Sequence, residues 1–174
     1  MLHPTLLPAL GAFLLCAAPA AAHAAGPSDA EIAHIAYTAG VLDAAAGASA
    51  VAKSTNPAVR EFAQTMVRDH NSVNEQALAL VAKLKVSPQP NAISESLSTE
   101  AKKTAARLAG LQGAAFDRAY VENEVAYHRA VNDALRTTLI PSADNAELKA
   151  LLETGLTLFQ AHQQHAEHLA AELK

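Results

Sequence analysis

The chain has 174 residues, of which 51% are apolar, 17% are charged and 4% are aromatic, and its formal net charge is −4. The high apolar fraction excludes a disordered polyelectrolyte, and the lack of a basic excess argues against nucleic acid as a partner. The single cysteine, Cys16, cannot form a disulfide within the chain. The length is enough for one domain, and the abundance of alanine favours helices.

Residues 1–25 have the pattern of a secretory signal peptide. An apolar segment over residues 6–18 is followed by small residues that end in Ala22-His23-Ala24, which is an A-x-A-like processing site. Prolines and a glycine interrupt the apolar segment, which is also short for a membrane span, so a membrane anchor is the less favoured interpretation. We therefore expect cleavage near Ala24 and export of residues 26–174 to the periplasm as one domain.

The first two predicted helices are separated by a sharp turn. The first begins at Ser28, where a capping box is present, and ends near Ser54. Asn56 suits the N-cap of the second helix and Pro57 suits its first position. This second helix is expected to end near Lys85, because a segment rich in proline follows.

The second half of the chain predicts two more long helices. A long connector with a short helix over residues 92–112 leads to a third long helix over about 114–140, which Pro141 ends. Asp144 with Glu147 can start the fourth helix, which continues to the C-terminus. No segment of useful length alternates apolar and polar residues, so we expect an all-α four-helix bundle without a sheet. The second and third long helices can run parallel or antiparallel.

Each long helix carries an apolar stripe at alternating steps of three and four residues, which is the spacing of a bundle seam. One ionisable residue interrupts each stripe near its middle: Asp43, His70, His128 and His162. Counted from the predicted turns at about 1.5 Å per residue, these four residues lie at similar heights. The sequence therefore predicts that three imidazoles and one carboxylate meet inside the bundle at about half its length.

A shared metal ion would explain such a cluster, because a buried ionisable group is costly unless it is paired. Neutral imidazole and carboxylate groups are good ligands for Zn, Cu(II) or Fe. Glu124 lies one turn before His128, and His165 lies three residues after His162, so both are further candidates. The predicted site for one transition-metal ion comprises Asp43, His70, Glu124, His128, His162 and His165.

The alternative is a metal-free network of hydrogen bonds among Asp43, the three imidazoles, Tyr120 or Tyr127, and water. Asp69 points about 100° away from His70 around the helix axis and is expected to be a surface charge. The face of the first helix that is rich in glycine and alanine, with Gly40 and Gly47, predicts a close contact between helices.

Three segments carry a family resemblance: residues 56–63, residues 66–70 with the Asp-His pair, and residues 116–121 with the run Phe-Asp-Arg-Ala-Tyr. Together with His128 and His162, they resemble the bacterial secreted family called domain of unknown function 4142. The resemblance covers about residues 29–173. It implies a ferritin-like four-helix bundle that is exported to the periplasm or outer membrane, and it implies no settled activity.

Two differences bear on the metal, one from the family and one from ferritin-like di-iron proteins. The family often has Glu at the position of Asp43, and the aspartate side chain has the shorter reach toward a metal. The Glu-x-x-His pairs of ferritin-like di-iron proteins are missing, since Val67 precedes His70 by three residues and Phe159 precedes His162 by three. A histidine-rich site for a single ion is therefore expected in place of a carboxylate-bridged di-iron site.

Three functions fit these patterns. The first is an exported bundle that binds a metal ion in its core. The second is a non-enzymatic envelope or stress module whose metal-free polar core sets the register of the helices. The third, an oxidoreductase that uses the metal, is the least favoured, because no base, nucleophile or cofactor motif accompanies the ligands. The mature chain is not expected to span a membrane, since no long uncharged stretch is apolar enough.

Overall fold

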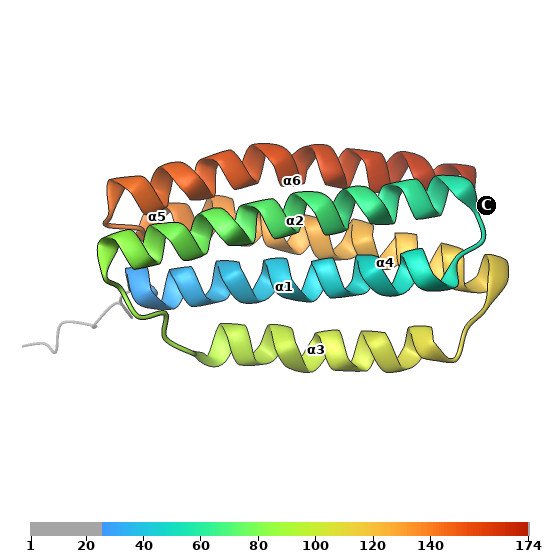
Figure 1. Ribbon diagram of the computed structural model, residues 1–174, viewed down its shortest axis with the longest axis horizontal. Helices are drawn as coiled ribbons and strands as arrows, with labels where there is room; N and C mark the ends of the chain where they lie inside the picture. The colour runs from blue at the N-terminus through green and yellow to red at the C-terminus, as the bar shows by residue number, and fades with distance from the viewer. Residues whose placement is uncertain (1–25, 174) are drawn as a thin grey trace, which may run out of the picture.

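The computed structural model describes residues 26–173, so the predicted signal peptide lies outside the described residues. The helices of the bundle are α1 (Asp29–Lys53), α2 (Pro57–Leu84), α4 (Gly113–Ala134) and α6 (Ala146–Glu172). A further helix, α3 (Ala92–Ala109), lies alongside them (Figure 1). The described residues contain no β-strand. These elements confirm the all-α bundle that the periodicity predicted.

The order of the helices in space follows from one long crossover. Figure 1 shows α1 and α2 running antiparallel, after which the chain returns along α3 to the far end of the bundle. As a result α4 runs parallel to α2, and α6 runs antiparallel to α4. One long crossover between the second and third bundle helices is the connectivity of ferritin-like folds. The parallel arrangement is therefore the correct one of the two that the sequence left open.

Capping residues set the ends of the helices. The predicted capping box at Ser28 and the predicted Asn56 cap are both present. Helix α6 differs from the prediction, because the side chain of Asn145, not Asp144, accepts hydrogen bonds from the first turn. The backbone N–H groups of Asp144 and Asn145 both donate to the carboxylate of Asp29. This contact holds the turn so that Asn145 occupies the N-cap.

Helix α4 continues into a π-helical segment, η1 (Leu135–Leu139), and a final turn, α5 (Ile140–Ser142). The ring of Pro141 excludes the carbonyl group four residues earlier and supplies no N–H. A π-helical turn accommodates the proline ring and the missing backbone hydrogen bond, so the helix continues past this point. The helical path therefore extends two residues past the predicted end.

The core consists of two apolar halves with a polar layer between them. One half is rich in aromatic side chains and includes Phe62, Phe116 and Tyr120. The other is mainly aliphatic and has Phe159 at its edge. Every long helix passes from one half to the other through the level of the predicted cluster. The buried ionisable residues of this cluster are Asp43, His70, Glu124, His128 and His162.

The contact between α1 and α2 is close because α1 presents glycine to α2. A Cβ atom on Gly47 would lie 3.0 Å from the carbonyl oxygen of Ala63, and one on Gly40 would lie 2.2 Å from Oδ1 of Asn74. This confirms the close helix–helix contact that was predicted. No stretch of the mature chain was expected to be apolar enough to cross a membrane, yet among the described residues α1 alone is long and apolar enough by length and composition; a core helix passes the same test.

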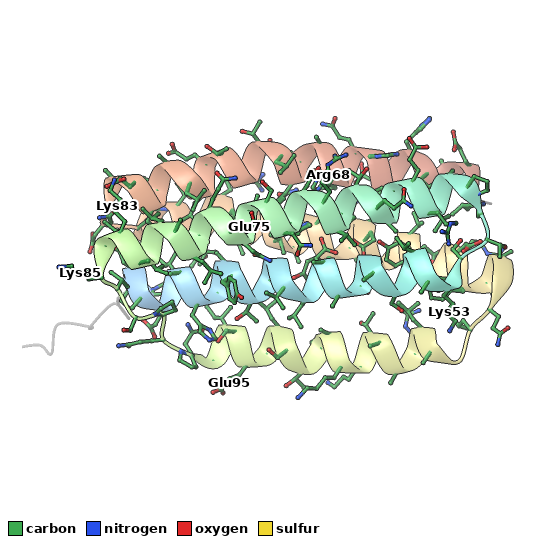
Figure 2. The ribbon with its side chains drawn as sticks, viewed as in Figure 1. Lys53, Arg68, Glu75, Lys83, Lys85 and Glu95 are labelled. Atoms are coloured by element: carbon green, nitrogen blue, oxygen red, sulfur yellow. The ribbon has the colours of Figure 1, made fainter. Side chains whose placement is uncertain are left out.

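Helix α3 is attached mainly at its ends. The Lys53 ammonium group donates to the carbonyl oxygens of Leu108 and Ala109, at 2.7 Å each, and so links the end of α1 to the end of α3 (Figure 2). At the other end, the side-chain amide of Asn91 donates to the backbone carbonyl oxygen of Glu31 in α1, at 3.4 Å. The buried residues of α3 are Ser94 and Leu108, near its two ends. Its middle therefore covers the bundle without being deeply packed.

Candidate metal centre

Five of the six predicted site residues come together at the middle of the bundle. Each of the four bundle helices contributes at least one side chain: α1, α2, α4 (twice) and α6. All five are at most 4% exposed. They are Asp43, His70, Glu124, His128 and His162.

The potential ligand atoms of these residues form two groups that share His128. One atom each from His70, His128 and His162 lie within 4.8 Å of one another, and so do atoms from Asp43, Glu124 and His128. Ligands on opposite sides of an ion with bonds of ~2.0–2.2 Å are ~4.0–4.4 Å apart. The cluster therefore has about the size of one coordination sphere.

Hydrogen bonds outside the cluster set the tautomers of two imidazoles. Nδ1 of His128 lies 3.0 Å from the backbone carbonyl oxygen of Glu124, which only accepts, so this nitrogen donates. Nε2 of His162 lies 3.0 Å from Oδ2 of Asp69 and donates in the same way. The lone pairs are thus left on Nε2 of His128 and Nδ1 of His162, both buried and without a hydrogen-bond partner in residues 26–173. Metal-binding histidines are oriented in this manner.

Asp69 corrects a prediction, because it is not simply a surface charge. Its side chain is 17% exposed and connects His162 to Arg68, whose Nε lies 2.7 Å from Oδ1 of Asp69. Figure 2 shows Arg68 on α2, near the middle of the bundle. Burial opposes ionisation, yet the hydrogen bonds from Arg68 and His162 lower the pKa of Asp69. The side of α2 that points 100° away from His70 faces α6, not solvent, and a pattern on α2 alone does not reveal this neighbour.

Asp43 is an ionised carboxylate at the centre of the cluster. Its Oδ2 lies 2.5 Å from Nε2 of His70 and 3.4 Å from Nε2 of His128. Burial opposes ionisation, but the hydrogen bond and the charge interaction with His70 lower the pKa of Asp43 to about 2. Since Nε2 of His128 carries no proton in the tautomer above, two lone pairs face each other at 3.4 Å. Such a contact is repulsive unless a cation or a proton lies between the atoms.

Glu124 behaves as a neutral acid at this site. Burial, and then the negative charge of Asp43, raise the pKa of Glu124 well above its usual value. A hydrogen bond with the Asp43 carboxylate also contributes to this rise, and neither oxygen of Glu124 has another hydrogen-bond partner among the described residues. A cation bound nearby would oppose this rise and favour the ionised carboxyl group.

His165 is not brought into the cluster. It is exposed and belongs to neither ligand group in the described chain. Its ring contacts Phe62 edge-on, with 5.1 Å between the ring centroids. Three residues on a helix turn the side chain by about 300°, so His165 lies ~60° around α6 from His162 and leaves the interior. The predicted His162-x-x-His165 chelate is therefore not formed.

The tyrosines do not complete the metal-free network that was the alternative. The hydroxyl of Tyr127 donates to the carbonyl oxygen of Ala39 at 2.8 Å, away from the cluster. The buried hydroxyl of Tyr120 has no hydrogen-bond partner in the described part of the chain. Neither hydroxyl therefore donates to a side chain of the cluster in residues 26–173.

Acid should destabilise the metal-free protein through its histidines. Burial lowers the pKa of His162 to about 4 and also lowers the pKa of His128. Between about pH 6.5 and 4, His162 binds a proton in the unfolded chain but not in the folded one. The free energy of unfolding therefore decreases as the pH is lowered through this interval. The loss from His162 is at most about 3.4 kcal/mol.

Urea unfolding of the metal-stripped protein at pH 4, 5, 6 and 7 measures this loss. In the His162→Gln variant, the free energy of unfolding should change less with pH over this interval. Equal slopes in the two proteins would show that His162 does not titrate in this way.

The fold and the site define a ferritin-like helical bundle with a buried centre of histidines and carboxyl groups. The chain belongs to the family described as Domain of unknown function (DUF4142), whose family model matches residues 14–169. This confirms the resemblance of its motifs. No curated protein and no solved structure matches the chain.

Proposed function

We propose that this protein is an exported bundle that binds one transition-metal ion in its core. The ligands are one ring nitrogen of His70, Nε2 of His128, Nδ1 of His162 and the carboxylate of Asp43. The observation that carries the proposal is the inward orientation of unpaired ligand atoms, above all Nε2 of His128, which lies 3.4 Å from Oδ2 of Asp43 and has no hydrogen-bond partner in residues 26–173. A divalent cation between these atoms would turn their repulsion into attraction.

One ion is favoured over two because both ligand groups depend on His128. Its Nδ1 donates to the carbonyl oxygen of Glu124, so Nε2 alone is free to bind a metal. Glu124 then lies beside the ion as an acid that can lose its proton when the cation binds. Three imidazoles and one carboxylate suit Zn(II), Cu(II) or Fe(II).

Export is part of the proposal and rests on the pattern of residues 1–25, with its apolar segment and its A-x-A-like processing site. Cleavage near Ala24 would remove the single cysteine, Cys16. The mature chain would then suit the oxidising periplasm, because it could not form disulfides. No thiolate would then be available to a metal ion.

Metal titration tests the binding. The mature protein, stripped of metal with a chelator, is titrated with Zn²⁺ and Cu²⁺ and its metal content is measured by elemental analysis after dialysis. We expect one ion per chain in the wild type and none in His128→Ala. The matched control is His165→Ala, which removes an exposed histidine and should still bind one ion. Absence of binding in the wild type, with chelator leaving its melting temperature unchanged, would favour the metal-free structural module.

Asp69 should control affinity without touching the ion. Asp69→Asn weakens the hydrogen bond that orients His162, so metal affinity should fall by about 10–100-fold at unchanged stoichiometry. Competition with a chromogenic chelator measures this loss.

The control for Asp69 is Asp133→Asn, which also removes an aspartate paired with arginine, here Arg136, but on the surface away from the cluster. Its affinity should equal that of the wild type. An equal loss in both variants would mean that a general change in charge, and not the orientation of His162, weakens binding.

A further inference from the structure

A cavity of about 140 Å³ lies in the aliphatic half of the bundle, directly beside the histidine cluster. Its walls come from α1, α2, α3, α4, η1 and α6, and His70, His128 and Phe159 line the end toward the cluster. No aspartate, glutamate, lysine or arginine lines it. The space is therefore mainly apolar, with polar atoms from the two histidines and from Asn74 and Tyr127 in its lining.

The cavity follows from the distribution of side-chain sizes. Phe62, Phe116 and Tyr120 fill the other half of the core. In this half, Phe159 is the aromatic side chain of the core, and it stacks on His70 with 4.7 Å between the ring centroids. Small residues line much of the remaining wall: Ala33, Ala36, Ala39, Gly40, Ala77, Ala134 and Gly155. Protein interiors are normally close-packed, so a space of this size destabilises the fold when empty.

The cavity reaches the surface beside α3. Ile93 of α3 is 44% exposed and Ala130 of α4 is exposed, yet both line the cavity. Since α3 is buried mainly near its two ends, the part of the bundle that it covers is accessible from its edge. A small molecule could therefore enter between α3 and α4 without unfolding of the bundle.

We propose that this cavity binds a small uncharged apolar molecule, about the size of benzene or toluene, with one end against the imidazoles of His70 and His128. The size supports this class, because an apolar cavity of about 150 Å³ in another protein stays dry and holds benzene or xenon. The lining supports it too, because a charged ligand would find no counter-ion along the walls. Binding does not require the metal, so the two proposals can fail separately.

The probe is toluene, added to the metal-stripped mature protein. Methyl groups of the lining leucines, such as Leu135, Leu139 and Leu152, report binding through their NMR shifts. We expect saturable shifts confined to the cavity, one toluene per chain, and a melting temperature that rises with toluene. Benzoate, which has a similar ring and a negative charge, should cause neither change. The proposal would be overturned if the NMR shifts rose linearly with toluene concentration up to its solubility limit. It would also be overturned if benzoate changed the shifts and the melting temperature as much as toluene does.

Filling the cavity should abolish this binding. Ala39→Leu places a larger side chain on a buried wall residue of α1, and toluene affinity should fall by about tenfold or more. Ala48→Leu adds the same atoms to an exposed position of α1 outside the cavity and should bind as the wild type does. Leu152→Phe fills the cavity from α6 and replaces Ala39→Leu if that variant does not fold. Wild-type affinity in the folded filling variants would refute the assignment.

Discussion

Saturation with a matching metal ion should raise the melting temperature of the metal-stripped protein by about 8–16 °C. A ligand that binds only the folded state stabilises it by about 4.1 kcal/mol when the free ion is at 1,000 times its dissociation constant. For a chain of this length, each kcal/mol shifts the melting temperature by roughly 2–4 °C. Differential scanning calorimetry with and without Zn²⁺ or Cu²⁺ measures the shift.

The His128→Ala variant separates specific binding from general effects of the ion. It lacks the ligand shared by both groups in the cluster, so its melting temperature should not respond to the metal. Circular dichroism establishes that the variant is folded before the comparison. An equal shift in the wild type and in His128→Ala would place the bound ion elsewhere.

Replacement of Glu124 by methionine should stabilise the metal-free protein by about 1–3 kcal/mol. The carboxyl group is fully buried, its pKa is raised by burial and by the Asp43 carboxylate, and its oxygens have no hydrogen-bond partner other than Asp43 in residues 26–173. Removing an unsatisfied buried polar group and keeping a similar volume recovers its desolvation penalty. Urea unfolding at neutral pH measures the gain.

Glu122→Met is the matched control, because Glu122 is an exposed glutamate on the same helix. Its effect should stay within about 0.5 kcal/mol. Metal stoichiometry in Glu124→Met should remain one, since Glu124 lies outside the proposed ligand set. A loss of stability in Glu124→Met would mean that the acid makes a hydrogen bond worth more than its burial costs.

These results would place the protein among those that sacrifice stability for a site. The polar layer separates two apolar halves that would otherwise form one continuous core. Buried ionisable groups often contribute less to stability than apolar side chains of the same volume. A bound cation would supply the compensation that the protein groups lack.

Periodicity and local signals in the chain were sufficient to predict the helices, most of their ends and the level at which the ionisable residues meet. A residue on an apolar stripe faces the interior of any bundle that the helix joins, so Asp43, His70, His128 and His162 could be placed without knowledge of the neighbours. The caps at Ser28 and Asn56 are equally local, because each involves atoms within one turn.

Contacts between helices settled the rest. The parallel run of α2 and α4, the bridge from Arg68 through Asp69 to His162, the outward position of His165 and the cavity under α3 all depend on which helix lies beside which. A helical pattern specifies the angle of a side chain around its own axis. It does not specify what lies at that angle, because the positions of neighbouring helices result from packing of the whole chain.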